Sequence, residues 1–553
     1  MKKRKPVRWV IKRVRKRIPA LLFMTAIDVA ISLLGVAFAL GTRGVINAAT
    51  SGVRGALWDA CLVQGAIIVA MLVCLTVFRH LRDRIVADLD RDWKRDLLDG
   101  LLHGDYAAVS SYHSGELLNR LNNDVRIIDD GLVGMLPNLA AMVTRLIAAM
   151  AVLVAMEPWF ALVIVAAGIA VVAVTSIMRH LLKDLHKRVS ETEGKVSGFI
   201  QETIENLLMV QAMDVADEME NRAEVLLEER YEAQRKRKNT SLLANTGISV
   251  LSYTASFFAL VWCAGGLLNG SMSFGDLTAV TSLVGQLQGP FVNLSGIIPQ
   301  YVGITAAAER LMEISEICGE KPPAGEEPQR IYADMRAIVA RDLSFSYDRD
   351  AVFENASFTL PKGSFTVITG ASGIGKSTLL KLMLGVFTPS GGGLYIEGDG
   401  GEIELDRSTR RLFAYVPQGN LLLSGTLRDN LTLTKPDATE EEIAQAVYVS
   451  GMDEYLSQLP GGLDTVLGED GAGLSQGQAQ RLAIARAVLG GAPILLLDEI
   501  TSALDGDTEK TVLERIRDLG GRTCIAVTHR PAALELADYR IEVSEQGMRV
   551  ESI

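Results

Sequence analysis

Long apolar runs alternate with charged stretches through residues 1–320. The first run, residues 18–41, contains a single charged residue, Asp28. A helix of about 23 residues is roughly 35 Å long, which exceeds the hydrocarbon thickness of a bilayer, about 30 Å. The pattern therefore predicts six membrane-crossing helices. The five after the first cover residues 56–78, 136–156, 159–178, 242–268 and 277–298.

The sixth run is the most polar, and its side chains suit a bundle interior or an aqueous path better than a lipid-facing position. Asp28 and Arg145 lie near the middle of the first and third runs, where an unpartnered charge is costly. Their opposite charges predict an ion pair, within or between chains. The alternatives are contact with a substrate or proton, and unpaired charges that face a cavity. The candidate substrate-path residues are Asp28, Arg145, Gln286, Gln288 and Asn293.

The loops between the runs alternate in length and charge. The connections at residues 79–135 and 179–241 are long and hold eight and eleven Lys and Arg, whereas the short loops together hold only Arg43 and Arg54. Residues 1–17 add ten more basic residues and no acid. The excess of positive charge on cytoplasmic loops places the N-terminus, both long connections and, after an even number of crossings, the C-terminus in the cytoplasm. Mixed charge at helical spacing predicts that the crossing helices continue into the long connections.

The rest of the chain is a separate, acidic domain. Residues 321–553 hold 22 Lys and Arg against 34 Asp and Glu, so the net charge of −11 belongs to this part and nucleic acid is not an expected partner. Five scattered cysteines predict neither a disulfide framework nor a metal site. We predict a transmembrane domain over residues 1–318, a proline-containing linker over 319–330 and a soluble domain over 331–553.

The soluble domain contains a phosphate-binding loop in its required context. An apolar strand at residues 365–369 runs directly into Gly-Ala-Ser-Gly-Ile-Gly-Lys-Ser-Thr at 370–378, and a helical pattern follows. Backbone N–H groups of such a loop curl around phosphates, Lys376 reaches the β and γ phosphates, and the hydroxyl of Ser377 can ligate Mg²⁺.

A second apolar strand, residues 494–497, ends in Asp498 and Glu499. Acidic residues at the carboxyl end of a buried parallel strand lie where open α/β sheets bind their ligands. Such a pattern is common by itself, but with a phosphate-binding loop upstream it predicts that Asp498 orients Mg²⁺ and Glu499 activates water.

Leu-Ser-Gln-Gly-Gln-Ala-Gln-Arg at 474–481 resembles the signature sequence of ATP-binding cassette (ABC) proteins. The resemblance extends, in the order of the family, to Tyr-Val-Pro-Gln at 415–418, Ser-Ala-Leu-Asp at 502–505 and Thr-His-Arg at 528–530. In the membrane half, residues 112–125 and those from 210 onward are similar to the cytoplasmic loops of exporter-type ABC half-transporters. The resemblance thus covers nearly the whole chain.

This resemblance implies a multidomain fold: an all-α transmembrane domain of six helices, followed by an α/β P-loop ATPase domain. It implies that adenine stacks on Tyr347 and that His529 contacts the γ-phosphate. The implied catalytic residues are Glu499, His529 and Gln418, and the implied Mg²⁺ ligands are Ser377, Gln418 and Asp498. The implied ATP-binding residues are Tyr347, Gly370, Ser372, Gly373, Gly375, Lys376, Ser377, Thr378, Ser475, Gly477, Gln478 and Asp505.

One residue departs from the pattern of the family. Gln476 replaces the first of the two signature glycines, so the backbone geometry at this position becomes a question for the structure. Ser475 and Gly477 remain available for a γ-phosphate of the partner chain. Because Glu499, His529 and Ser475 are all present, a homodimer would contain two competent sites, and it is favoured over a heterodimer.

The family implies ATP-driven export by a dimer with alternating access, using ATP and Mg²⁺, in a bacterial plasma membrane. The substrate class is left open between lipid, peptide and drug-like molecules. An importer of siderophore type with the same fold, and an ATP-regulated channel or regulator, are the alternatives. Short coupling helices that press on the ATPase domains are expected near residues 113–118 and 214–218. No peptidase-like segment precedes the first helix, so cleavage of a peptide leader is not expected.

Overall fold

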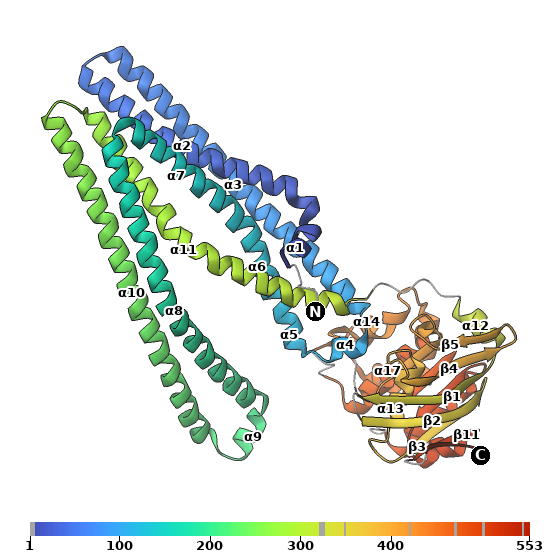
Figure 1. The fold of residues 1–553 in the computed structure, drawn as a ribbon. Coiled ribbons are helices and arrows are strands. Elements are labelled where there is room, and N and C mark those ends of the chain that lie inside the picture. The colour runs from blue at the N-terminus through green and yellow to red at the C-terminus, as the bar shows by residue number, and fades with distance from the viewer. Residues whose placement is uncertain are drawn as a thin grey trace. The chain divides into compact units, whose positions relative to one another are not determined.

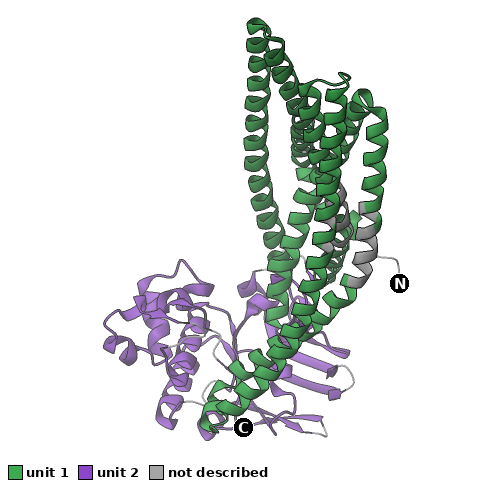
Figure 2. Cartoon of the chain, turned by 90° about the vertical axis from the view of Figure 1, so that its left-hand side faces the viewer, with its two compact units in different colours: residues 1–99, 113–316 green, residues 100–112, 317–553 purple. Residues whose placement is uncertain are grey.

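The computed structural model describes residues 6–319, 327–347, 350–419, 422–468, 473–499, 504–544 and 547–553. The chain forms two compact units, coloured separately in Figure 2. Unit 1 comprises residues 1–99 and 113–316, and unit 2 comprises residues 100–112 and 317–553. The predicted linker, residues 319–330, lies largely outside the described residues.

Unit 1 is built of long helices and shorter helical segments (Figure 1). Among the described residues, an N-terminal segment precedes six long helices, which cover all six predicted apolar runs and continue beyond several of them, as the charge pattern predicts. The helices are α1 (Pro6–Arg13), η1 (Val14–Arg17), α2 (Ile18–Ser51), α3 (Arg54–Leu102), α5 (Ser114–Asn119), α6 (Val125–Asp130), α7 (Leu136–Met156), α8 (Pro158–Glu205), α9 (Leu207–Ala212), α10 (Ala216–Leu268) and α11 (Phe274–Ile317), with π-helical turns η2 (Arg120–Asp124) and η3 (Gly131–Met135).

Four helical stretches of the described residues are long and apolar enough to cross a membrane: Pro6–Ser51, Arg54–Leu102, Ser114–Met156 and Ala216–Leu268. They contain the first, second, third and fifth predicted crossings. The fourth falls on α8, whose described apolar part, Pro158–Ala170, is shorter. The sixth falls on the more polar α11 and stays a prediction.

The long helices pack in pairs. Helix α8 runs beside α10 and helix α2 beside α7 (Figure 1). A core of fully buried apolar residues joins α2, α7, α8, α10 and α11, with Phe160 and Leu283 among its largest members. This core excludes water from the middle of the bundle and so fixes how the helices lie against each other.

Ion pairs hold unit 1 together outside the apolar runs. The guanidinium of Arg310 in α11 donates two hydrogen bonds to the buried carboxylate of Asp124, at 2.8 and 2.5 Å. Arg120 donates to the carbonyl of Arg310 at 2.9 Å and to Glu313 at 3.2 Å. These contacts tie the π-helical turn η2 to α11.

Asp129 lies in α6, before the third crossing, and its side chain is buried. Within the described residues, neither of its carboxylate oxygens accepts a hydrogen bond that meets the usual distance and angle limits. Burial, together with the charges of Asp90 and Asp130, raises the pKa of Asp129 to about 8, although Trp93 and Lys94 oppose the shift. At neutral pH this carboxyl group is therefore protonated in the folded protein and ionised in the unfolded protein.

We expect the stability of the wild-type protein to fall as pH rises from about 4 to about 8, by up to about 1.4 kcal/mol per pH unit from Asp129 alone. Asp129→Asn should remove this contribution, so its melting temperature should rise relative to wild type as pH approaches 8. The exposed Asp83→Asn is the control. Parallel pH profiles for wild type and Asp129→Asn would contradict the assignment.

Unit 2 contains two larger sheets and a small one. The antiparallel sheet has the order β2-β1-β4-β5, the central sheet the order β12-β11-β3-β10-β9-β6, and β7 pairs with β8. The strands are β1 (Met335–Tyr347), β2 (Asp350–Pro361), β3 (Phe365–Gly370), β4 (Gly391–Gly398), β5 (Gly401–Glu404), β6 (Phe413–Val416), β7 (Gly425–Thr426), β8 (Val466–Leu467), β9 (Ile494–Asp498), β10 (Thr523–Val527), β11 (Tyr539–Ser544) and β12 (Gly547–Ser552).

Unit 2 also contains short helices, and two clusters of buried apolar residues form its core. The helices are α4 (Tyr106–Ser110), α12 (Pro328–Asp334), α13 (Lys376–Met383), α14 (Leu427–Leu431), α15 (Glu440–Val449), α16 (Asp453–Gln458), α17 (Gln476–Leu489), α18 (Gly506–Asp518) and α19 (Pro531–Leu536), with 3-10 turns η4 (Arg410–Leu412), η5 (Thr432–Thr434) and η6 (Gly462–Asp464).

Residues 100–112 come from the membrane half of the sequence but belong to unit 2. Arg407 donates hydrogen bonds to the carbonyl oxygens of His103 and Gly104, and the ring of Tyr106 meets Phe387 edge-on at 6.0 Å. The short helix of this connection that belongs to unit 2 is thus α4, whereas the predicted residues 113–118 fall in unit 1.

The second expected coupling helix is also displaced. The short helix at the turn between α8 and α10 is α9, several residues before the predicted 214–218. Asp214 takes a left-handed backbone conformation, with φ of 55°, and lies between the end of α9 and the start of α10. The loop motifs of the family mark the right turns of the chain, but the backbone at each turn decides where its helix lies.

Candidate functional site

Four sequence motifs meet at one edge of the central sheet. Strands β3, β10, β9 and β6 are neighbours and parallel, so their carboxyl ends point the same way. Strand β3 leads into the phosphate-binding loop, and β10 leads into His529. Strand β9 ends at the pair Asp498–Glu499, and β6 leads into Gln418. The topology thus brings together residues that are up to 159 positions apart, from Gly370 to His529, at the edge where open α/β sheets bind ligands.

The phosphate-binding loop closes tightly before α13. Gly375 has φ of 103°, and a β-carbon there would lie 2.2 Å from Val352, so only glycine fits. Lys376 is buried, and its ammonium group donates to the carbonyl oxygens of Gly370 and Ala371 at 2.8 Å each. The loop therefore encloses a fixed cation beside the N-terminus of α13, where anions bind favourably.

Ser377 and Asp498 form a pair of oxygen ligands. The Ser377 hydroxyl donates to Asp498 Oδ1 at 2.9 Å, and the Tyr415 hydroxyl donates to Asp498 Oδ2 at 3.1 Å. Burial raises the pKa of Asp498, and these two hydrogen bonds oppose the shift. Neighbouring ligands of an octahedral Mg²⁺ lie about 3 Å apart, so the separation of the Ser377 and Asp498 oxygens fits this ion.

Glu499 lies next to Asp498 and has a left-handed backbone, with φ of 49°. Its N–H donates to the carbonyl of Val527 at 2.9 Å, and its carboxylate accepts a hydrogen bond from the Gln418 amide. The structure thus joins two of the three predicted catalytic residues directly. His529, the third, is exposed in the loop after β10.

Tyr347 ends β1 and is 44% exposed. Its hydroxyl lies 3.1 Å from that of Thr378 in α13, which places the ring beside the phosphate-binding loop. Phe345 and Phe387 meet this ring edge-on, at 4.9 and 5.5 Å between centroids. These contacts hold a partly exposed aromatic ring in a fixed orientation, which is what stacking on a base requires.

The signature residues cap helix α17. Ser475 Oγ accepts from the N–H of Gln478 at 3.3 Å, and the Gln478 side chain accepts from the N–H of Ser475 at 2.8 Å. Gln476 is exposed at the first position of the helix, where the backbone is ordinary, so glutamine in place of glycine requires no strain. Asp505 caps α18 by accepting a single hydrogen bond from the N–H of Thr508 at 3.0 Å. Ser502 and Ala503 lie outside the described residues.

The candidate substrate-path residues contact neighbouring helices. Arg145 donates a hydrogen bond to the Ser32 hydroxyl at 3.4 Å, and Ser32 lies one helical turn after Asp28. The guanidinium of Arg145 is close enough to Asp28 for an electrostatic interaction. No direct ion pair between Asp28 and Arg145 occurs among the described contacts. Gln286 donates to the Gly35 carbonyl at 3.0 Å, and Gln288 to Ser256 at 2.8 Å. The side chain of Asn293 lies outside the described residues.

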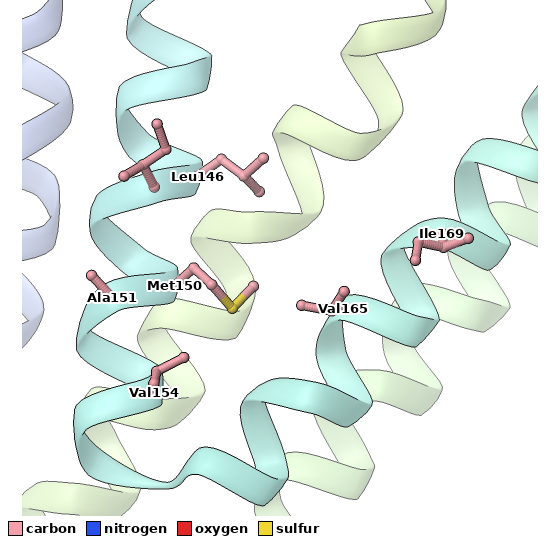
Figure 3. Close-up of a pocket in the computed structure, with 7 residues that line it drawn as sticks. Leu146, Met150, Ala151, Val154, Val165 and Ile169 are labelled. Atoms are coloured by element: carbon pink, nitrogen blue, oxygen red, sulfur yellow. The ribbon is translucent and has the colours of Figure 1, made fainter.

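An open apolar groove lies between α7 and α8 (Figure 3). It has a volume of about 680 Å³ and is lined by hydrocarbon and one thioether. Its lining residues are Leu146, Ile147, Met150, Ala151, Val154, Val165 and Ile169. The chemistry of this groove suits acyl chains or other apolar groups.

Sequence reasoning missed Tyr415 as a partner of Asp498, and α4 as part of unit 2. Tyr415 begins the Tyr-Val-Pro-Gln motif at 415–418, but its hydrogen bond to Asp498 joins residues 83 positions apart. A local signal for α4 exists: Asp105 caps its first turn by accepting from the N–H of Ala107 at 2.9 Å, a typical helix start.

Replacing Lys376 with alanine should weaken ATP binding itself. The change removes the buried cation of the loop, and a hydrogen bond to a charged group contributes about 1.5–3 kcal/mol, so we expect a loss of about tenfold or more in affinity. Nucleotide titration of the purified protein measures this, with the exposed Lys510→Ala in α18 as control. An unchanged ATP affinity for Lys376→Ala would show that the ammonium does not face the phosphates.

Comparison with known proteins gives two family matches. Residues 21–291 match the ABC transporter transmembrane region, and residues 353–502 match the family described as ABC transporter. A cyclolysin secretion/processing ATP-binding protein of Bordetella pertussis is 32% identical over 380 residues, 68% of this chain and 52% of that protein. An alpha-hemolysin translocation ATP-binding protein of Escherichia coli is 31% identical over 383 residues, 69% of this chain and 53% of that protein.

The chain thus spans about half the length of these curated relatives. An uncharacterized ABC transporter ATP-binding protein of Bacillus subtilis is 27% identical over 448 residues, 79% of this chain and 72% of that protein. Among solved structures, a bacterial Atm1-family ABC exporter with ATP bound superposes with a TM-score of 0.79 at 24% identity, over 98% of this chain and 95% of the other. At that identity the match shows the fold.

Proposed function

Because this chain belongs to the ABC transporters, with a transmembrane region and an ATP-binding region in one polypeptide, we propose that it is an ATP-driven exporter that works as a dimer. The observation that carries this proposal is the pairing of Ser377 with Asp498 and of Gln418 with Glu499 at the edge of the central sheet, in a chain that also contains helices long and apolar enough to cross a membrane. The orientation that follows from the basic loops puts both termini in the cytoplasm of a bacterial cell.

The site residues have two roles, which are nucleotide binding and proton transfer. Lys376 and the backbone of the loop bind the phosphates, and Tyr347 holds the base. Glu499, oriented by its hydrogen bond from Gln418, accepts a proton from the attacking water, and His529 contacts the γ-phosphate. Ser377, Asp498 and Gln418 would hold Mg²⁺, which when bound offsets the negative charge of the transferred group.

A second chain completes each site in this proposal. Ser475 caps α17, and Gly477 and Gln478 lie in its first turn. As the resemblance to the family implies, we assign these residues to the nucleotide of the partner. Two copies of this chain would give two complete sites, which favours a homodimer. ATP between two chains shifts the inward-open and outward-open populations because it binds the closed pair better.

We assign the tip of the α8–α10 hairpin to a contact with the partner chain, as the second loop motif of the family implies. Within unit 1, helix α9 and its flanks expose a group of large apolar side chains, and covering them needs a second surface. These residues are Ile204, Leu207, Leu208, Met209 and Met213.

The substrate class is open among lipids, peptides and drug-like molecules. The groove in Figure 3 favours a substrate that has an apolar portion. Purified protein should show ATPase activity that a transported compound stimulates. We expect a screen of lipids, peptides, siderophores and drugs to find stimulation that disappears in Glu499→Gln. Absence of any ATPase activity in lipid-reconstituted protein would contradict the proposal.

A further inference from the structure

The connection between β10 and α19 is short, and it carries His529. Strand β10 ends at Val527 and α19 begins at Pro531, so the connection consists of residues 528–530. Thr528 is buried, and its hydroxyl accepts a hydrogen bond from the N–H of Arg530 at 3.1 Å. The position of the exposed His529 side chain therefore depends on what holds Arg530.

The guanidinium of Arg530 reaches the connection between β9 and α18. Its Nη1 donates to the carbonyl oxygen of Leu504 at 2.8 Å and to Glu509 Oε2 at 3.2 Å. Leu504 is the residue before Asp505, and the N–H of Glu509 donates to the Asp505 carbonyl at 2.9 Å. Arg530 thus contacts the chain on both sides of Asp505, one of the expected ATP-site residues.

The connection between β9 and α18 is also held at its other end. Directly after β9 comes Glu499, whose N–H donates to the carbonyl oxygen of Val527 at 2.9 Å. Val527 and Arg530 lie on either side of His529 in the sequence. The connection that begins with the expected general base is therefore attached, at both of its described ends, to the segment that carries His529.

Glu509 gives Arg530 a part in stability as well. Its side chain is 2% exposed, and within the described residues its second carboxylate oxygen, Oε1, accepts no hydrogen bond. A buried carboxylate that loses its cation is strongly destabilising. An experiment on Arg530 must therefore separate a loss of stability from a loss of turnover.

We propose that Arg530 is a positioning residue for ATP hydrolysis, which holds the connections of Glu499 and His529 at the separation that turnover requires. The inference rests on the roles proposed above for these two residues. A misplacement of about 1 Å at a reacting group can cost about a hundredfold in rate. ATP affinity depends instead on the phosphate-binding loop and Tyr347. Loss of the guanidinium should therefore lower kcat and leave the KM for ATP unchanged.

Four variants of the full-length protein test this role: Arg530→Met, Arg530→Lys, Glu509→Gln and the double variant R530M/E509Q. ATPase kinetics, nucleotide titration and thermal unfolding are measured for each. We expect Arg530→Met to lower Tm and to lower kcat by about tenfold or more, with the KM within about twofold of wild type. The double variant has no stranded carboxylate, so its Tm should recover, while its kcat should stay about tenfold or more below that of Glu509→Gln.

The lysine variant separates charge from reach. Lysine keeps a cation opposite Glu509, but its side chain is shorter, and we expect it to lose the contact with the Leu504 carbonyl. Its Tm should match that of wild type, and its kcat should lie between those of wild type and Arg530→Met. The matched control is Arg517→Met in α18, because Arg517 contacts the Leu536 carbonyl at 2.9 Å and Asp538 at 3.3 Å, outside the site. It should leave kcat unchanged.

Recovery of both Tm and kcat in the double variant would overturn the proposal, because Arg530 would then serve stability alone. A loss of ATP affinity as large as the loss of kcat would also overturn it. If neither variant with methionine at position 530 folds, Arg530→Lys decides: a lower kcat at unchanged Tm and KM supports the role, and a wild-type kcat overturns it. Glu499→Gln, measured alongside, keeps the two failures apart, because turnover in that variant would remove the general base whatever Arg530 does.

Discussion

Glu499→Gln is expected to abolish ATP turnover while ATP binding remains. The amide keeps the size of the side chain and can still accept the hydrogen bond from Gln418, but it cannot take a proton from the attacking water. General-base catalysis contributes about a hundredfold or more, so we expect turnover to fall by at least that factor. Steady-state ATPase rates and nucleotide affinities, measured on the same preparation, separate the two effects.

The matched control is Glu514→Gln, an exposed residue of α18 that has the same chemistry and lies outside the site. It should leave turnover unchanged. Retention of more than roughly a tenth of wild-type turnover by Glu499→Gln would remove this residue from the role of general base, because the remaining groups could not supply that fraction without a base.

The second large effect concerns the division of each site between two chains. Lys376→Ala and Ser475→Arg should each inactivate the homodimer, since every site would lose one of its two halves. In a mixed dimer of the two variants, one site contains both defects and the other contains neither. We expect the mixed dimer, isolated with two affinity tags, to regain roughly half of wild-type activity if the sites turn over independently.

A doubly tagged dimer with Lys376→Ala in both chains controls for the tags and for exchange during purification. If Ser475 acted on the nucleotide of its own chain, each chain of the mixed dimer would contain one defective site. Activity no higher than that of the two parent dimers would therefore contradict the trans arrangement.

The sequence predicts those parts of the fold that depend on local pattern. The long helices of unit 1 can be read from the apolar runs, and the start of α13 from the glycines and lysine of residues 370–376, since each signal lies within one element. Four of the six predicted crossings fall in stretches long and apolar enough to span a membrane. The order of strands in the central sheet comes from the structure, and it brings Lys376, Asp498 and Gln418 to one edge.

Contacts between distant segments could not be predicted in the same way. The packing of Tyr106 on Phe387 joins positions far apart in the sequence, and neither residue belongs to a motif. The burial of Asp129 depends on how α6 meets α3, which a charge pattern does not encode. The expected coupling helices are displaced for a related reason: motif positions give the turn, whereas caps and backbone conformation give the helix.

The central claim is that ATP hydrolysis drives a compound across the membrane away from the side of the ATP sites. Proteoliposomes in which these sites face outward test this claim. ATP, Mg²⁺ and a compound that stimulates the ATPase are added to the outside solution. We predict accumulation of that compound inside with wild type, and none with Glu499→Gln or without ATP. ATP-dependent loss of preloaded compound would instead indicate an importer. Flux that only runs down its gradient, with or without hydrolysis, would indicate a channel and contradict the account.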